Sequence, residues 1–261
     1  PGHGAVAQPG LRGLIGWYAT GDAFFQVERY VVAAVGVFLV AVAMLAWSFA
    51  GYPLTLFCLS KLRPNRVDRG PHFPPVTVLI CTYKEAKVIE RRLDNLLESD
   101  YPRDRLDILV VDSASPDGTA DIVSEYCAAH PAAPIRLIRE DVRRGKVSAI
   151  NLGLTQAEGD VVILTDAPAL FWPDTIRLIL ENFKDPEVGG ATGRWVNYPY
   201  AAETAAQKSR RPIVGFRTML RHLESEVDST YAVTGELIAF RKRLVPSIPA
   251  HIGQDLSLIH I

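Results

Sequence analysis

Glu85, Asp112 and Asp166 each come soon after a short apolar segment of the sequence, where a strand is expected to end. Carboxylates gathered at one place repel one another unless a divalent cation or a ring of hydrogen-bond donors lies between them. Taken singly, each of them is as often the cap or turn former that follows a strand. Three at one edge of a sheet predict a site built around such a cation or such donors.

Lys146 brings the opposite charge. It follows Gly145, and Arg143 and Arg144 precede that glycine. On its own, a lysine here would be interpreted as a solvated residue at the start of a helix, although the two arginines beside it weaken that interpretation. The pair Gly145-Lys146 is not a P-loop, because Val147 follows it and no glycine stands five residues earlier. No G-x-G-x-x-G motif follows the first apolar segment either, so a dinucleotide site is not supported.

The composition excludes several other classes of protein. The 261 residues are 48% hydrophobic and 22% charged, which is enough for one well-packed domain and an additional segment. A net charge of -1 provides no basic field for nucleic acid, so no nucleic-acid partner is expected. Three widely spaced cysteines exclude a disulfide framework and a cysteine zinc site, and the six histidines contain no H-E-x-x-H pair.

Strand-like and helix-like segments alternate after residue 75. The expected strands are 76–81, 106–111, 135–138 and 161–164, with a further one at 188–196. The expected helices are 85–99, 120–129, 147–157 and 173–184. Such repeats predict an α/β fold with right-handed crossovers and a mostly parallel sheet between helices. Ligands of such sheets bind beyond the carboxyl ends of the strands, where the acidic residues fall.

The segment 30–60 contains no charged residue. A helix of about 20 apolar residues crosses a bilayer core of about 30 Å, so we expect a membrane span rather than a buried core helix or a signal peptide. The sequence Gly51-Tyr52-Pro53 is expected to break or kink it. Basic residues outnumber acidic ones in 61–69, which predicts that the later domain is cytoplasmic, at the cell inner or plasma membrane.

Both ends of the chain look unnatural. It begins at Pro1 without an initiator Met, and 256–261 resembles the translated end of a sequencing transposon, the alternative being the start of a native helix. We therefore expect a fragment of a longer protein. The predicted organisation is an N-terminal flank 1–29, a membrane segment 30–60, a basic and Pro-rich linker 61–75, an incomplete α/β domain 76–255, and a non-native tail 256–261.

Four segments together resemble family-2 glycosyltransferases. They read VTVLICTYKE (76–85), VVDSASPDGT (110–119), RGKVSAINLG (144–153) and LTDA (164–167), and their order and spacing match over residues 74–255. The resemblance implies a GT-A fold that binds a nucleotide-diphosphate sugar and transfers the sugar with inversion. An N-terminal span before such a domain is similar to the membrane-bound branch that builds extracellular polysaccharides.

The resemblance also assigns donor-binding residues. It implies that Thr82, Tyr83 and Glu85 line the nucleoside pocket, with the Tyr83 ring near the base. It implies that Asp112 accepts hydrogen bonds from the uracil imide or the ribose, and that Lys146 reaches a donor phosphate. A UDP-sugar is the donor we expect, and a glycan or lipid-linked molecule the acceptor.

Asp166 resembles the first acidic residue of the family's DxD metal motif, which implies donor binding through Mg²⁺ or Mn²⁺. The sequence departs from the motif at its third position, where Pro168 has neither carboxylate nor amide. Lys84 is a smaller departure, because relatives often have Asn there. The resemblance therefore implies Asp166 alone as the side-chain metal ligand of this motif.

On the acceptor side, Gly235 and Glu236 resemble the segment along which the acceptor approaches. An inverting transfer needs a carboxylate base. Asp255 matches the second residue of the family's late acidic pair, with Gln254 in place of the first. We expect a membrane-anchored inverting glycosyltransferase with Asp255 as base. The alternatives are transfer to a polyprenyl phosphate, or a silent nucleotide-sugar-binding subunit of a synthase complex, which Pro168 and Gln254 would favour.

Overall fold

The computed structural model describes residues 12–193, 205–230 and 236–249, with side chains described from residue 28 onward and, in the helix that starts at Ala205, from residue 215. The chain forms two compact units, Pro1–Leu62 and Arg63–Ile261, which we describe separately.

The first unit is helical. Helix α1 (Arg12–Ala46) continues through a π-helical segment (Trp47–Gly51) into α2 (Tyr52–Leu62). The expected interruption takes the form of this π turn, in which the Tyr52 N–H bonds to the Trp47 carbonyl, directly before Pro53, whose ring nitrogen has no hydrogen to donate. By length and composition alone, the part Glu28–Leu62 is sufficient to cross a membrane, and most of its apolar side chains are exposed, Leu56 being an exception.

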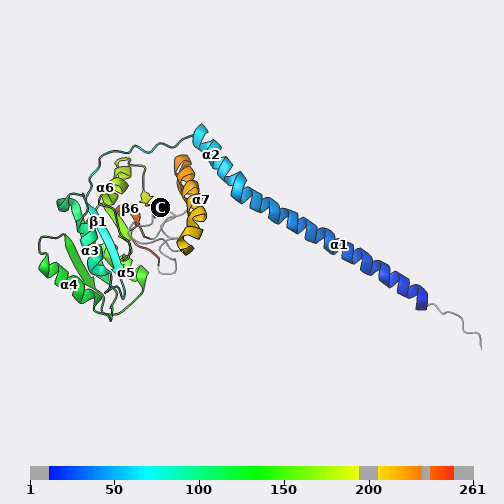
Figure 1. The fold of residues 1–261 in the computed structure, drawn as a ribbon, viewed down its shortest axis with the longest axis horizontal. Helices are drawn as coiled ribbons and strands as arrows, with labels where there is room; N and C mark the ends of the chain where they lie inside the picture. The colour runs from blue at the N-terminus through cyan, green and yellow to red at the C-terminus, as the bar shows by residue number, and fades with distance from the viewer. Residues whose placement is uncertain (1–11, 194–204, 231–235, 250–261) are drawn as a thin grey trace, which may run out of the picture. The chain divides into compact units, whose positions relative to one another are not determined.

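The second unit is built on one six-stranded sheet in the order β3-β2-β1-β4-β6-β5. The strands are β1 (Val76–Thr82), β2 (Leu106–Asp112), β3 (Ile135–Arg139), β4 (Val161–Thr165), β5 (Gly190–Thr192) and β6 (Ile238–Arg241). Strands β1 to β4 are parallel, and β6 runs antiparallel to β4 and β5 (Figure 1). The expected mostly parallel α/β sheet is confirmed.

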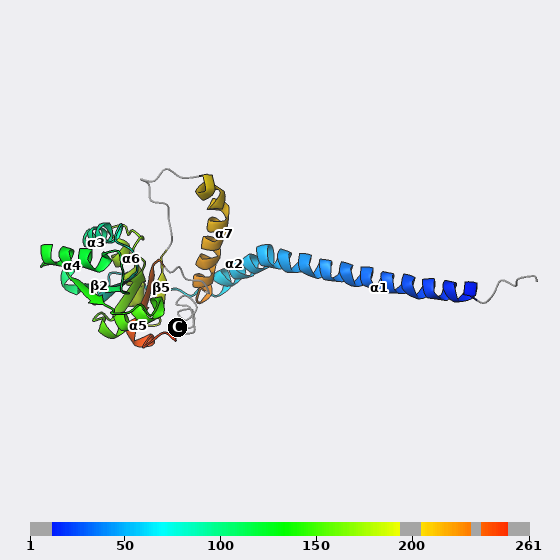
Figure 2. The same ribbon diagram turned by 90° about the horizontal axis from the view of Figure 1, so that it is seen from below.

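Helices cover both faces of this sheet. Alternate residues of β1 point to opposite cores: Val78 and Ile80 pack with α3, α4 and α6, whereas Leu79 packs with α5. Figure 2 shows α5 on the opposite side of the sheet from α3 and α6. Helix α5 approaches β1 closely, because a Cβ at Gly153 would lie 2.3 Å from the Leu79 side chain. The helices are α3 (Ile89–Leu97), α4 (Thr119–Ala129), α5 (Lys146–Gln156), α6 (Thr175–Leu180) and α7 (Ala205–Val227), with short 3-10 turns at Arg103–Arg105, Glu181–Lys184 and Lys242–Leu244.

The first crossover helix is shorter than the sequence predicts. Residues 85–88 form a turn, and α3 begins only at Ile89. Val88 has φ -124°, outside the helical region, so the helix begins only after it, and the Glu85 carbonyl accepts the Val88 and Ile89 N–H groups in the preceding turn. Among the described residues, the strand expected at 188–196 is formed only over Gly190–Thr192.

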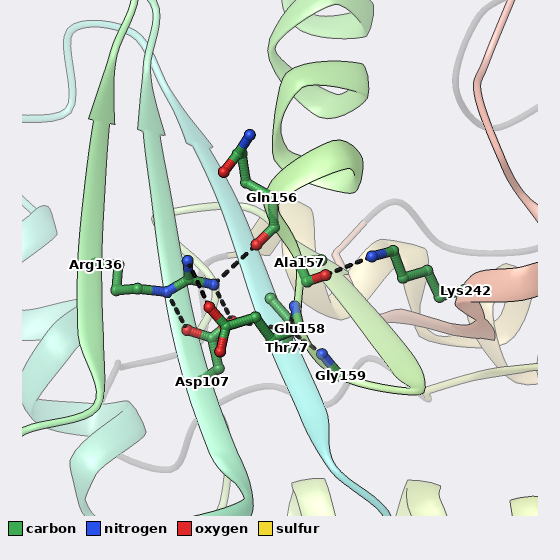
Figure 3. A network of polar contacts seen from close by, with 8 residues as sticks. All are labelled: Thr77, Asp107, Arg136, Gln156, Ala157, Glu158, Gly159 and Lys242. Carbon is green, nitrogen blue, oxygen red and sulfur yellow. Dashed lines mark hydrogen bonds and ion pairs between the residues drawn. The ribbon is translucent and has the colours of Figure 1, made fainter.

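A closed polar network ties the amino ends of the parallel strands together (Figure 3). Arg136 of β3 donates to both carboxylate oxygens of Asp107 of β2, at 2.8 and 2.7 Å. The Thr77 hydroxyl of β1 donates to Asp107 at 2.8 Å and accepts the N–H groups of Glu158 and Gly159 at 3.1 and 2.9 Å. Every charge in this network has a partner, which fixes the sheet edge opposite the site described next.

Candidate active site

A pocket of about 360 Å³ lies at the carboxyl ends of β1, β2 and β4. Five of the six donor-side residues expected from the sequence line it, and these are Thr82, Tyr83, Glu85, Lys146 and Asp166. The other lining residues are Cys81, Ser113, Arg143, Gly145, Ala167 and Pro168. Of these, Glu85 and Asp166 were expected from the strand ends, and Thr82, Tyr83 and Lys146 from the family resemblance; the fold brings residues up to 84 positions apart (82 to 166) around one cavity.

The turns that shape this pocket adopt unusual backbone conformations. Lys84 follows β1 with φ 62°, and Ala114 follows β2 with φ 51°. Each left-handed non-glycine residue costs about 1–2 kcal/mol, and such strain persists only where the surroundings hold it. Hydrogen bonds between the two loops hold these conformations in place. The Lys84 N–H donates to Ser115 Oγ at 3.1 Å, and the Glu85 N–H donates to Thr119 Oγ1 at 3.0 Å.

Asp112 lies beneath the pocket rather than in its lining. It is 2% exposed, and its two carboxylate oxygens accept the Thr82 hydroxyl at 3.0 Å and the Ser115 N–H at 2.9 Å. These bonds join the end of β1 to the turn after β2. In this arrangement Asp112 organises the two turns, and its contact with a nucleoside stays a prediction.

Lys146 and Asp166 form the central ion pair of the site. The Lys146 Nζ lies 2.6 Å from Asp166 Oδ1, and both side chains are partly exposed to the pocket. Lys146 begins α5, and the preceding Gly145 has φ 97° and ψ 166°, a region that is essentially restricted to glycine. In the part of the chain that the structure describes, no side chain caps this helix, so its first N–H groups and its dipole favour an anion at the same place.

The acidic residues of the pocket influence one another. Partial burial raises the pKa of Glu85, and the negative charges of Asp166 and Asp117 raise it further, against the opposing effect of Lys146. Burial also raises the pKa of the Cys81 thiol to about 12. This cysteine therefore lines the pocket as a neutral thiol and does not act as a nucleophile.

A metal ion fits this site only together with a ligand. Within the described residues, no group of three His, Cys, Asp or Glu side chains could hold an ion by itself. Asp166 supplies one carboxylate, and Pro168 supplies no side-chain ligand. Mg²⁺ and similar cations commonly bind one or two carboxylates and complete their coordination with water and substrate phosphates. The donor set therefore suits a cation brought in by a diphosphate.

Tyr83 presents an aromatic surface at the other side of the pocket. The Arg143 guanidinium lies 3.8 Å from the centre of its ring, and Lys84 Nζ lies 5.4 Å from it. A planar base could stack on either flat group. Sequence reasoning noted Arg143 only as a neighbour of Lys146 and did not pair it with Tyr83, because the two are 60 positions apart (83 to 143).

Glu140 is a further residue of this region that the sequence analysis did not single out. It follows β3 and accepts hydrogen bonds from Ser113 Oγ at 2.6 Å and Ser148 Oγ at 3.3 Å. The rule that singled out Glu85, an acidic residue soon after a strand, would have found it. By joining the turn after β2 to the first turn of α5, Glu140 helps to position the Lys146 end of that helix.

The acceptor-side predictions lie mostly outside the described residues. Gly235 and Asp255 are among those not described. Glu236 is described, and its backbone carbonyl accepts the Thr165 hydroxyl at 2.7 Å, which holds it beside Asp166. On the other side of the sheet, Asn151 exchanges two hydrogen bonds with the Ile248 backbone, at 2.8 and 2.7 Å. Asn151 thus has a packing role that anchors the segment leading toward residue 255.

This arrangement of fold and pocket matches a known family. The sequence profile of glycosyl transferase family 2 covers residues 77–245, more than half of the chain. The chain belongs to glycosyl transferase family 2. Its α/β fold is similar to the solved structure of the mannosyltransferase PcManGT of Pyrobaculum calidifontis, in complex with GDP-Man and Mn²⁺, at a TM-score of 0.68 and 36% identity. That match covers 85% of this chain and 61% of the mannosyltransferase.

Curated relatives in the same family are similar over shorter stretches. The "Probable glycosyltransferase YdaM" of Bacillus subtilis (strain 168) is 32% identical over 136 residues, 51% of this chain and 32% of the relative. The poly-beta-1,6-N-acetyl-D-glucosamine synthase of Staphylococcus epidermidis is 29% identical over 119 residues, 45% of this chain and 28% of the synthase. The chain thus matches about a third or less of the length of these two relatives.

Proposed function

We propose that this chain is the donor-binding part of a membrane-anchored glycosyltransferase that moves a sugar, with inversion, from a nucleoside diphosphate sugar to a glycan acceptor. The observation that carries the proposal is the convergence of Lys146, Asp166 and the open N-terminus of α5 on one pocket. A cation, a carboxylate and free backbone N–H groups are what a metal-bound diphosphate requires.

Each residue has a distinct task in this proposal. Asp166 would hold the metal, which supplies charge neutralisation of the departing diphosphate. Lys146 would turn from Asp166 to a phosphate oxygen, because a diphosphate offers it more negative charge than one carboxylate does. Tyr83 and Arg143 would hold the base by stacking. Asp255, which lies outside the described residues, would take the proton of the acceptor hydroxyl.

Membrane attachment and pathway are part of the proposal as well. The long apolar helix Glu28–Leu62, uncharged over residues 30–60, supports an anchor, and the basic residues at 61–69 support a cytoplasmic catalytic domain at the inner or plasma membrane. The similarity to a poly-beta-1,6-N-acetyl-D-glucosamine synthase supports a role in extracellular polysaccharide synthesis. The donor is proposed as a UDP-sugar, while the relative solved with GDP-Man makes GDP-sugars the necessary comparison.

The test uses the full-length protein in lipid nanodiscs. Turnover is assayed over a panel of UDP- and GDP-sugars with Mn²⁺, Mg²⁺ or EDTA, beside Asp166→Asn and Asp255→Asn. We expect one donor to turn over in a metal-dependent way and both variants to lose activity. Asp121→Asn is the control, because the one ion pair of its carboxylate among the described residues is an exposed contact with Arg139. Donor binding without turnover in any metal would instead identify a silent subunit.

A further inference from the structure

Arg92 of α3 is a charged residue in the middle of the core. It is the largest by volume of the fully buried side chains that the structure describes, and it is 0% exposed. Burial lowers its pKa to about 9, with the negative charge of Asp166 acting against that shift, so the guanidinium is charged at neutral pH. A buried charge costs free energy that an apolar side chain of similar volume would not. None of the ion pairs found among the described residues includes Arg92.

The contacts of Arg92 lead to both ends of the segment 165–171. One terminal nitrogen donates to Thr165 Oγ1 at 3.0 Å, and the guanidinium lies 4.0 Å from the centre of the Phe171 ring. The other terminal nitrogen donates to Asn95 Oδ1 at 2.9 Å. Asn95 in turn bonds both the N–H and the carbonyl of Phe171, at 2.8 and 2.9 Å. The arginine therefore holds this segment at its first and its last residue.

The segment held in this way carries Asp166. Thr165 precedes Asp166 directly, and its hydroxyl donates a hydrogen bond to the Glu236 carbonyl at 2.7 Å. One hydrogen-bonded chain thus runs from Arg92 through Thr165 to the acceptor-side segment. Because Pro168 offers no second ligand, the position of a bound cation depends on where this one carboxylate points.

We propose that Arg92 is a positioning residue for the metal site, fixing the direction of the Asp166 carboxylate from behind through Thr165, Asn95 and Phe171. The inference rests on the proposed function, since it assumes that Asp166 holds the cation of a nucleoside diphosphate. Arg92 itself touches neither cation nor donor. Its role is to make the segment 165–171 rigid before they arrive.

Positioning and charge have opposite effects on cation binding, which makes the proposal testable. The positive charge of Arg92 repels a cation nearby, so loss of the charge alone would tighten Mn²⁺ binding. Loss of the hold on the segment would weaken it. Arg92→Met removes both charge and hold while keeping apolar volume. Arg92→Lys keeps the charge but cannot make both hydrogen bonds, to Thr165 and to Asn95, at once. Thr165→Val keeps the arginine and removes the hydroxyl to which it donates.

The experiment measures Mn²⁺ binding by electron paramagnetic resonance, with the full-length protein in nanodiscs and saturating UDP, and in a parallel series with GDP. We expect Arg92→Met and Thr165→Val to raise the Kd of Mn²⁺ about tenfold, the scale known for groups that orient a metal ligand. Arg92→Lys should recover part of that loss. Thr77→Val is the matched control, because it removes an equally buried hydroxyl at the opposite sheet edge and should lower the melting temperature without changing the Kd.

The outcomes separate this inference from the proposed function. Sugar transfer by the unaltered protein tests the function, and the variants test the positioning. A folded Arg92→Met protein that binds Mn²⁺ as tightly as, or more tightly than, the unaltered protein overturns the inference while the function stands. If Arg92→Met does not fold, Thr165→Val and Arg92→Lys decide by the same criterion. An unaltered protein that binds no Mn²⁺ with either nucleotide overturns both.

Discussion

The amino ends and the carboxyl ends of the parallel strands, called here the amino edge and the carboxyl edge of the sheet, use the same kinds of side chain in opposite ways. At the amino edge, Arg136 and Asp107 are joined by two hydrogen bonds, and Thr77 closes the gap to the neighbouring turn (Figure 3). At the carboxyl edge, Lys146 and Asp166 share one contact and face a cavity. The hydrogen bonds of Arg136 and Asp107 are satisfied within the protein. Lys146 and Asp166, beside a cavity, are able to exchange each other for a ligand.

This difference has a physical basis in the connections between strands. At the amino edge the chain enters each strand from a turn packed on its neighbours, so the side chains there can satisfy one another. At the carboxyl edge two left-handed turns, at Lys84 and Ala114, bend the chain back and leave a hollow between strand ends. Charges beside a hollow are paired weakly, since water and ligands compete for them. The comparison therefore predicts that substitutions affect stability at one edge and binding at the other.

The largest contrast is expected between two aspartates. Asp166→Asn should lower kcat about a hundredfold or more, because the metal's charge stabilisation is lost, with little change in melting temperature. Asp107→Asn should lower the free energy of unfolding by about 2 kcal/mol, because the amide cannot accept both Arg136 bonds, with little change in kcat. Steady-state kinetics and denaturant unfolding of both variants measure this. Equal effects on both quantities would contradict the division between the edges.

Two lysines provide the next contrast. Lys146→Met should weaken UDP binding about tenfold or more, the worth of a charge-assisted hydrogen bond. The same change should tighten Mn²⁺ binding in the absence of nucleotide, because the ammonium that occupies Asp166 is gone. Calorimetric titrations with UDP and with Mn²⁺ alone measure the two effects. Lys242→Met is the control: its ammonium bonds the Ala157 carbonyl at the amino edge, so neither affinity should change.

The contribution of Glu85 to stability should depend on pH, because burial and the nearby negative charges raise its pKa. Its pKa is raised in the folded protein, so the stability that its protonated form contributes is present below the unfolded-state pKa and is lost as pH rises through the folded one. Glu85→Gln should therefore raise the melting temperature at pH 7 and have little effect below about pH 4. Glu158→Gln, which removes an ion pair with Arg136, should have the opposite sign at pH 7. Thermal unfolding at the two pH values tests both; a lower melting temperature for Glu85→Gln at pH 7 would contradict the assignment.

The smallest effect concerns backbone strain. Lys84→Asn should raise the free energy of unfolding by about 0.5 kcal/mol, since Asn tolerates a left-handed conformation better than Lys does. Lys87 is an exposed lysine three positions later without a positive φ, so Lys87→Asn should bring no gain. Denaturant unfolding of the two variants gives the comparison. A loss of stability in Lys84→Asn would mean that its contact with the Tyr83 ring outweighs the strain.

Part of the site was predictable because it follows from strand ends. The apolar segments located four strands to within a residue at their ends, and Glu85 and Asp166, expected from those strand ends, both line the pocket. Arg92 was not anticipated, although it is three residues after Ile89 and four before Leu96 and so shares their buried face. An arginine at that spacing is ordinarily taken as a solvated residue at the margin of a helix. Only its tertiary contacts with Thr165 and Phe171, 73 and 79 positions away, make it a core residue.

The sequence by itself determined the α/β order and the acidic residues that follow the strand ends, because hydrophobic periodicity and strand-end position are local properties; its four motifs, read as a resemblance, indicated the family. The tertiary structure alone decided the direction of each side chain at that edge. Asp112 turned beneath the pocket to bond two turns, while Lys146 turned into it to meet Asp166. Those directions depend on partners 20 to 30 positions away (146 to 166, 82 to 112), which become neighbours only when the strands pair.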